Sequence, residues 1–341
     1  MPKNLRAFSL IELSIVILIV SILLTGALSA TMFSVNKSKL HLTQERMQSV
    51  YKAMGIFLSK NGYLPCPAAI TLNKSSSSYG TAAATCTSAA GSASGYWKST
   101  NAASPNLFFG MVPTKTLGLS SEFSEDGFGG KIGYFILSGF TSATNFGKGP
   151  ASVASSKNYA NDSTISRIII KEKPTSELQI TNDAAFVLIS YGTNKSAGWN
   201  INSPTQNTAS ADAQEIENSL SNLDGTAGSA DFDNVLFISS ANSDNFDDII
   251  FYKTRDEMTL DFSLLSLVSC DEASPTQTIN YGGTDYGFTW AASSSTKYGA
   301  AAAANQLCAA GYTAGVARPT KKCGAFGKWE SDVTENCLQN P

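Results

Sequence analysis

The stretch FSLIELSIVILIVSILLTGALSATMF, residues 8–33, decides the fold of this chain. Its side chains are almost all apolar or small, with no Lys, Arg, Asp or Pro, and a helix of about 20 such residues can cross the hydrocarbon core of a bilayer. Glu12 is the one charge in the run, and its carboxylate needs a specific partner because a charge in an apolar helix costs a few kcal/mol. The sequence therefore predicts a transmembrane helix over residues 8–33.

The segment that follows is polar but keeps a helical repeat of apolar side chains. These side chains fall on one stripe, with the i, i+3, i+4, i+7 spacing of an amphipathic helix: Met47, Val50, Tyr51, Met54, Phe57 and Leu58. Asn61 and Gly62 then lead into YLPCPA, whose prolines rule out continued helix. We expect one helix over residues 8–60, with an amphipathic second half that covers a globular domain.

The first residues carry a resemblance to a known family. A short basic leader, MPKNLR, ends in Ala7, the aromatic Phe8 follows, and Glu12 is fifth from that aromatic. This pattern resembles the class III signal of type IV pilins and type II secretion pseudopilins, although the family more often has Gly where this chain has Ala7. The resemblance implies that a prepilin peptidase removes residues 1–7 and methylates the new Phe8 amine. It also implies that Glu12 neutralises the amine of a neighbouring subunit in a helical filament, built on an inner-membrane assembly platform.

Two other interpretations of the N-terminus remain open. A secretory signal peptide cut near Ala30 would end in suitably small residues, but its apolar core would be longer than usual and would contain a Glu. The second alternative is a plain single-span membrane anchor, in which Glu12 would have no specific role.

Composition limits the class of protein. At 341 residues the chain has room for two domains beyond its anchor, and 43% hydrophobic residues are enough for their cores. Charged residues make up only 15%, which gives a weakly charged surface that suits an extracytoplasmic protein. The formal net charge of -3 and the lack of a Lys/Arg-rich run argue against a nucleic-acid partner.

All cysteines lie beyond the apolar run, and their number is even: Cys66, Cys86, Cys270, Cys308, Cys323 and Cys337. Without a C-x-x-C pair, and with a single His, they indicate three disulfides in an oxidising compartment rather than zinc. Cys86 lies in an irregular Ser/Ala/Gly-rich excursion, residues 73–106, and is expected to close it onto Cys66. Such a bond would contribute about 3 kcal/mol to stability in the chain-entropy model.

Short β-branched and aromatic runs follow the excursion. IGYFIL, FVLIS, VLFIS and DIIFYK are bounded by Gly, Asn and Asp, which is typical of strands in an antiparallel sheet. One long helix followed by strands predicts an α+β fold in which the helix lies across the sheet. We expect this globular domain over residues 61–265. Residues 160–182 fit an extra strand or a short helical piece, and residues 214–223 a helix of about two turns.

The globular part extends the resemblance. DGFGGKIGY resembles a turn of the major pseudopilin, and FVLISYGTN with the later DDIIFY resembles its paired strands around a loop, here interrupted by a polar insert at residues 199–230. In pseudopilins that loop can bind calcium, which implies calcium as the one candidate cofactor. The oxygen-bearing residues nearest the matching positions are Asn194, Asp244, Asp247 and Asp248. Hard oxygen ligands suit Ca²⁺, although the three aspartates could instead cap and solvate a strand entry.

The tail, residues 266–341, is expected to form a small separate module stabilised by disulfides, because its core is small. It resembles tails of some minor pilins and, in its cysteine spacing, a complement-control module. That second likeness implies Cys270–Cys323 and Cys308–Cys337 pairs, although four cysteines allow three connectivities. The alanine run at residues 300–305 favours a short helix.

No catalytic residues are predicted. His41 is the only histidine and lies near the membrane end of the helix, so a Ser or Cys nucleophile would lack its usual base. The loop GFGGKIG, residues 127–133, fits neither phosphate-binding spacing and is better interpreted as a turn before a strand. A glycosidase with paired carboxylates in a cleft stays open as an alternative, because one sequence does not show which carboxylates lie together.

The hypothesis is a structural filament subunit: a pilin or pseudopilin anchored in the bacterial inner membrane with a periplasmic head. The excursion, insert and tail add bulk that would crowd a dense filament, which favours a minor subunit. The alternative is an adhesin displayed on a pilus, whose tail binds a surface or glycan through Trp290, Tyr312 and Trp329.

Overall fold

A computed structural model of the chain describes residues 10–84, 86, 95–98, 107–141, 146, 168–173, 179–219, 235–241, 243, 246–270, 276–281, 284–289, 297–303, 312–314, 320–324, 329–331 and 337–339. For residues 24–33 and nearly all of the strands beyond residue 275, the description is limited to the backbone.

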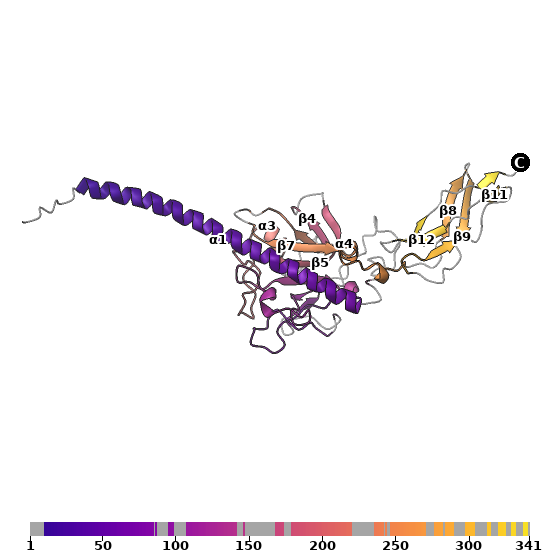
Figure 1. Ribbon diagram of the computed structural model, residues 1–341, viewed down its shortest axis with the longest axis horizontal. Helices are drawn as coiled ribbons and strands as arrows, with labels where there is room; N and C mark the ends of the chain where they lie inside the picture. The colour runs from indigo at the N-terminus through magenta and orange to yellow at the C-terminus, as the bar shows by residue number, and fades with distance from the viewer. Residues whose placement is uncertain are drawn as a thin grey trace, which may run out of the picture.

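One helix, α1, runs from Leu10 to Asn61, 52 residues in all. Its N-terminal part extends away from the rest of the molecule and its C-terminal part lies along the globular head (Figure 1). The predicted apolar stripe is the face that meets the head: Met47, Val50, Met54 and Leu58 are at most 1% exposed. The amphipathic second half of the helix is therefore confirmed.

Seven strands form the main sheet, in the order β1-β2-β3-β5-β4-β6, with β7 paired to β5. Their bounds are Trp97–Lys98 (β1), Leu107–Met111 (β2), Gly133–Leu137 (β3), Ile168–Lys171 (β4), Gln179–Ser190 (β5), Val235–Ile238 (β6) and Ile249–Thr254 (β7). All pairs are antiparallel except β4–β6, which is parallel. The sequence predicts antiparallel strands throughout, and this pair is the exception. The chain between β4 and β6 is long enough for the return that a parallel pair requires.

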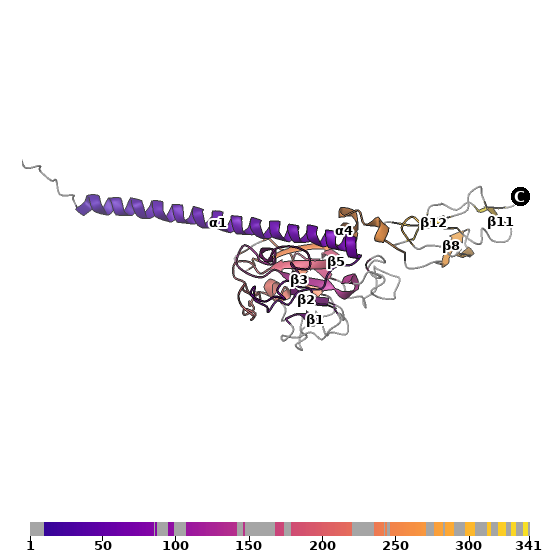
Figure 2. The same cartoon turned by 60° about the horizontal axis from the view of Figure 1, so that its bottom comes forward.

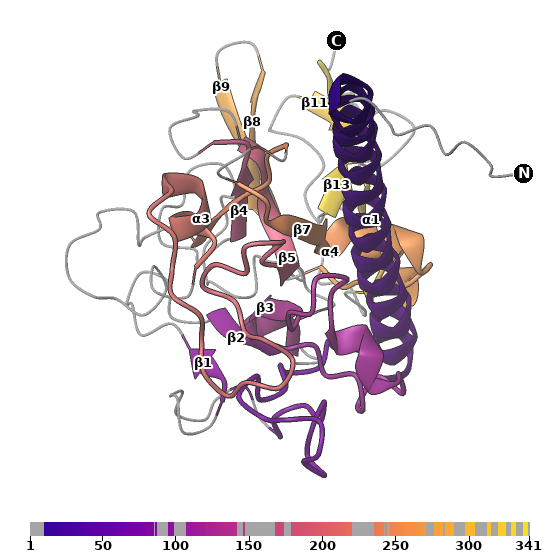
Figure 3. The same cartoon turned by 90° about the vertical axis from the view of Figure 1, so that its left-hand side faces the viewer.

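Helix α1 covers one side of this sheet (Figures 2 and 3). Tyr51 packs on Phe186 of β5 and Phe251 of β7, with ring centroids 6.1 and 5.4 Å away. Strands β2 and β3 and the second half of β5 are buried throughout, and they are rich in aromatic side chains, Phe135 and Phe186 among them. The α+β architecture, with a long helix across a largely antiparallel sheet, is confirmed.

The turn before β3 fastens α1 to the head. Asp126 folds the turn by accepting hydrogen bonds from the backbone of Phe128 (2.8 Å) and Gly130 (2.7 Å) and from the Ser190 hydroxyl (2.7 Å). The Gly127 N–H then donates to Thr43 Oγ1 of α1 at 2.9 Å. The loop GFGGKIG is thus a turn before a strand, as predicted, and it also contacts the helix.

Short helices complete the head: η1 (Ser121–Ser124), η2 (Ser138–Thr141), α3 (Ala213–Glu217), α4 (Arg255–Asp261) and η6 (Leu265–Leu267). The predicted helix at 214–223 corresponds to α3, which is a single turn. Of the predicted piece at 160–182, the described residues include two strands, β4 and the start of β5.

The C-terminal strands lie at the end of the molecule opposite the start of α1 (Figure 1). They are β8 (Thr276–Tyr281), β9 (Thr284–Thr289), β10 (Ala301–Ala303), β11 (Tyr312–Ala314), β12 (Thr320–Cys323), β13 (Trp329–Ser331) and β14 (Cys337–Gln339). The helix predicted at residues 300–305 is wrong, because Ala301–Ala303 pairs with β12 as a strand. Helix propensity in so short a run is weak compared with this pairing.

A polar contact between α1 and α4 gives a first testable result. The Tyr51 hydroxyl donates to Asp261 Oδ2 at 2.6 Å, and this hydrogen bond is the main cause that lowers the pKa of Asp261. Tyr51→Phe should cost about 1 kcal/mol of unfolding free energy at neutral pH. A carboxyl with a lowered folded-state pKa stabilises the fold fully above its unfolded pKa of about 4, so the difference should begin to shrink below about pH 4 and disappear as the pH falls through the folded-state pKa. Urea unfolding of the detergent-extracted chain at several pH values measures it, and Asp261→Asn should remove the same pH dependence.

Candidate functional site

The N-terminal processing residues Ala7 and Phe8 lie outside the described residues. Glu12 lies in the first turn of α1 and is exposed on the projecting part of the helix. The structure thus places Glu12 away from the head.

Among the described residues, no helix has a run both long and apolar enough to cross a membrane.

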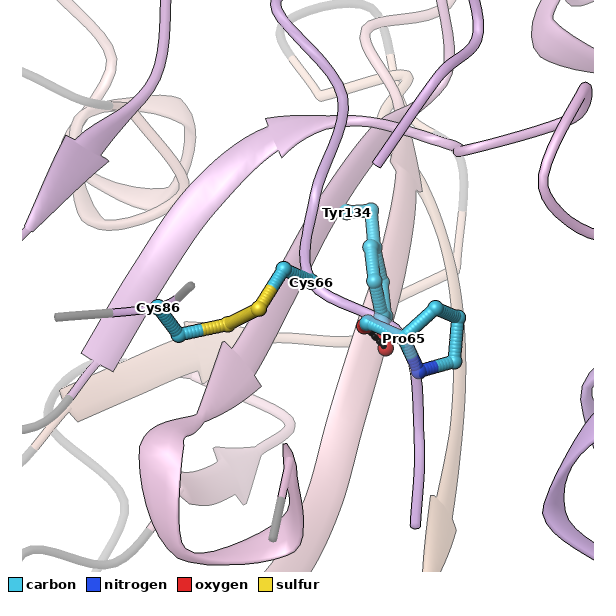
Figure 4. Close-up of a disulfide and its surroundings, with 4 residues drawn as sticks. All are labelled: Pro65, Cys66, Cys86 and Tyr134. Atoms are coloured by element: carbon cyan, nitrogen blue, oxygen red, sulfur yellow. Dashed lines mark hydrogen bonds between the residues drawn. A yellow bond between two sulfur atoms is a disulfide. The ribbon is translucent and has the colours of Figure 1, made fainter. Parts of the chain in front are cut away.

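Two disulfides are present in the described part of the chain. Cys66 is bonded to Cys86, and Cys270 to Cys323, which are the pairings expected. The third expected pair, Cys308–Cys337, lies outside the described side chains. The Cys66–Cys86 bond ties the excursion to the segment after α1, where Pro65 accepts a 3.1 Å hydrogen bond from the buried Tyr134 hydroxyl (Figure 4).

An acidic group gathers where β7 begins. Asp247 and Asp248 directly precede β7, and Glu215 comes from α3, within the polar insert. One carboxylate oxygen of each lies within 4.8 Å of the other two. Glu215 is 2% exposed and Asp248 4%. We call these three residues the acidic corner.

Within the described part of the chain, each carboxylate of the acidic corner has one hydrogen-bonded oxygen and one without a partner. Glu215 Oε1 accepts from Asn194 Nδ2 at 2.6 Å, and Asp248 Oδ2 accepts from Asn218 Nδ2 at 2.9 Å. Asp247 Oδ2 accepts from the backbone N–H of Thr193 and of Asn194, at 2.7 and 3.0 Å, and from the Thr193 hydroxyl. The second oxygen of each, Glu215 Oε2, Asp247 Oδ1 and Asp248 Oδ1, is buried and has no hydrogen-bond partner among the described residues.

The surroundings of the acidic corner disfavour the negative charge of its carboxylates. Burial is the largest cause and raises the pKa of Asp248 well above its usual range. The hydrogen bond from Asn218 lowers that pKa in part, and the nearby charges of Glu215, Asp247 and Asp212 raise it further. The described hydrogen-bond partners of the three carboxylates are amides and a hydroxyl, and none is a basic side chain. A bound cation would supply the missing positive charge.

The loop after β5 is shaped to receive Asp247. Gly192 has a φ of 57°, and a Cβ there would lie 2.4 Å from the Asp247 carboxyl carbon. Two further residues of the loop, Lys195 (φ 53°) and Ala197 (φ 57°), also adopt the left-handed region, which non-glycine residues rarely occupy. The backbone is therefore held in an unfavourable conformation next to the acidic corner.

The acidic corner fits the oxygen-only donor set that Ca²⁺ requires. Calcium binds oxygens at about 2.3–2.6 Å, so oxygens up to about 5 Å apart can share one ion. Of the residues that the resemblance implied, the corner contains Asp247 and Asp248. Asn194 borders it through its amide nitrogen, and Asp244 lies outside the described residues. Glu215 was missed; its only signal in the sequence was the helical pattern at 214–223, which says nothing about where the insert folds back.

Comparison with known proteins supports the resemblance at the N-terminus. The family model for the prokaryotic N-terminal methylation motif matches residues 2–28. No curated protein and no solved structure matches the chain. The matched residues include the leader, the Ala7–Phe8 junction and Glu12. Residues 2–28 thus carry the signal of type IV pilins and pseudopilins, a structural rather than enzymatic class whose subunits are processed by a prepilin peptidase and assemble with one another.

Proposed function

We propose that this chain is a minor subunit of a type IV pilus or a type II secretion pseudopilus. In this proposal a prepilin peptidase cuts between Ala7 and Phe8, and the subunit is held in the inner membrane by its N-terminal helix until it polymerises. The observation that carries the proposal is that the methylation motif, residues 2–28, overlaps the projecting end of a 52-residue helix that begins at Leu10, remote from the head.

The roles of Phe8 and Glu12 follow from this arrangement. Once residues 1–7 are removed, the Phe8 amine would be the nearest fixed positive charge for a Glu12 carboxylate in a bundle of such helices. An ion pair between neighbouring subunits would offset the cost of a charge in an apolar environment. It would also fix the axial position of one subunit against the next.

A minor role is supported by the bulk of the head. In the part of the chain that the structure describes, the excursion at 73–106 adds to the main sheet only the two-residue edge strand β1, and the insert and the C-terminal strands lie outside both the helix and that sheet. Subunits in a dense filament are packed closely, so added bulk favours a low copy number or a terminal position.

Mass spectrometry of sheared filaments and membranes tests the proposal. We expect the mature chain to begin at N-methyl Phe8 and to be scarce relative to the principal subunit. Glu12→Gln should reduce its incorporation into filaments at least ten-fold, because the neutral amide cannot pair with the amine, whereas Glu45→Gln, the same change on the head-bound half of α1, should not. A mature chain beginning near Thr31 would instead indicate a secretory signal peptide.

We also propose that the acidic corner binds calcium, as the resemblance implies. Asp247 and Asp248 would supply the central ligands. The support is the three buried carboxylate oxygens for which the described residues offer no hydrogen-bond partner.

A further inference from the structure

The acidic corner joins two parts of the chain that are far apart in sequence. Asp247 and Asp248 belong to the sheet, since they lead directly into β7. Glu215 belongs to the polar insert, residues 199–230, of which residues 199–219 are described. Their carboxylates therefore meet across the boundary between the insert and the sheet.

Helix α3 docks on the head through polar side chains. Glu215, Asn218 and Ser219 are the buried residues of this turn, at 0–2% exposure, whereas its apolar Ile216 is 37% exposed. A helix of one turn has no stability of its own, so tertiary contacts must hold it. Here those contacts include the approach of the Glu215 carboxylate to the carboxylates of Asp247 and Asp248.

Neutral contacts already orient α3 toward the corner. Asp212 caps the helix by accepting from the Gln214 and Glu215 N–H groups. Asn218 exchanges two hydrogen bonds with the backbone of Ile238 at the end of β6, 2.8 and 3.1 Å, besides its bond to Asp248. These bonds position Glu215, but none of them compensates its charge.

We propose that Glu215 is a calcium ligand contributed by the insert, so that the ion fastens α3 to Asp247 and Asp248 and holds the insert on the head. This inference rests on the proposed calcium binding at the acidic corner. The position of the insert on the surface of the subunit then depends on calcium. Glu215 would also add a third carboxylate ligand to the two that Asp247 and Asp248 supply.

Calorimetry and hydrogen exchange on the full-length, detergent-extracted protein test this inference. Calcium chloride is titrated into the chelator-treated protein, and exchange is followed by mass spectrometry in peptides that cover residues 209–219. We expect calcium to bind the unmodified chain and to slow exchange of the α3 amides at least ten-fold. Glu215→Gln keeps the oxygen that accepts from Asn194 but loses the charge, and should weaken calcium binding at least ten-fold and abolish the slowing. Glu217→Gln, the same change on the same helix but outside the acidic corner, should behave as the unmodified chain.

The outcomes separate the two proposals. If calcium binds Glu215→Gln as tightly as the unmodified chain, or binds the unmodified chain without slowing exchange in α3, the role of Glu215 is overturned and the calcium site at Asp247 and Asp248 stands. If calcium does not bind the unmodified chain, both proposals fail. A variant that unfolds would lose exchange protection in the sheet strands as well, and Asp248→Asn then provides the second test of whether α3 responds to the ion.

Discussion

Lys131→Met is expected to destabilise the head by at least about 2 kcal/mol at pH 7, since it removes three hydrogen bonds from a buried ammonium group. Lys131 is fully buried, and its Nζ donates to the carbonyls of Ile70 (2.7 Å), Leu72 (2.9 Å) and Ser203 (3.0 Å). These carbonyls belong to the segment after α1 and to the insert, so one side chain joins both to the start of β3. Methionine has a similar length and apolar stem but no donor for them.

The pH dependence of this loss distinguishes a hydrogen-bonding role from simple packing. Burial lowers the pKa of Lys131 to about 8, while Glu125 raises it in part. Because the folded-state pKa lies below the unfolded value of about 10.4, the unfolded chain binds more protons between these pH values and stability rises with pH. The unmodified chain should therefore gain up to about 1.4 kcal/mol per pH unit between about pH 8 and pH 10 relative to Lys131→Met.

Urea unfolding followed by tryptophan fluorescence at pH 7, 8, 9 and 10 measures both effects. Lys115→Met is the matched control, because Lys115 Nζ is exposed and donates to one carbonyl, that of Ser77. That variant should lie within about 0.5 kcal/mol of the unmodified chain at every pH. A Lys131→Met variant as stable as the control would show that water satisfies the three carbonyls.

The elements governed by local pattern could be predicted from the sequence. The stripe from Met47 to Leu58 identified the buried face of α1, because a helix repeats every 3.6 residues whatever it packs against. The runs IGYFIL and FVLIS became β3 and the buried half of β5. The first half of β5 carries exposed polar side chains, Gln179 and Asn182, so the sequence fitted a strand or a short helical piece there.

The features that depend on the path of the chain could not be predicted from the sequence. The parallel pairing of β4 with β6 and the approach of Glu215 to Asp247 both require knowing where a long insert returns. No spacing rule connects residues on either side of such an insert. The prediction of a helix at residues 300–305 failed for a related reason, since the strand partner of residues 301–303, β12, lies about 20 residues further along the chain.

Gly127→Ala is expected to separate the turn before β3 from α1 and to destabilise the head by about 3 kcal/mol, through overpacking and lost hydrogen bonds together. A Cβ at Gly127 would lie 2.2 Å from the carbonyl oxygen of Lys39 and 2.8 Å from its Cα. Both are backbone atoms of the helix and cannot move aside as a side chain would. Displacing the turn would break the Gly127–Thr43 bond and the bonds from Arg46 Nη1 to the carbonyls of Glu125 (3.1 Å) and Asp126 (3.3 Å).

Gly118→Ala separates this steric effect from backbone strain. Gly118 has a φ of 72°, and a Cβ there would meet no heavy atom within 4 Å, so alanine should cost only about 1 kcal/mol. Hydrogen exchange in α1 provides the specific readout: Gly127→Ala should accelerate exchange of the helix amides around Thr43, and Gly118→Ala should leave them unchanged. Equal unfolding free energies for the two variants, with unchanged exchange around Thr43, would mean that the turn does not fasten the helix. Because α1 carries the methylation motif at one end and the head at the other, loosening this contact would also loosen the link through which a filament would hold the head.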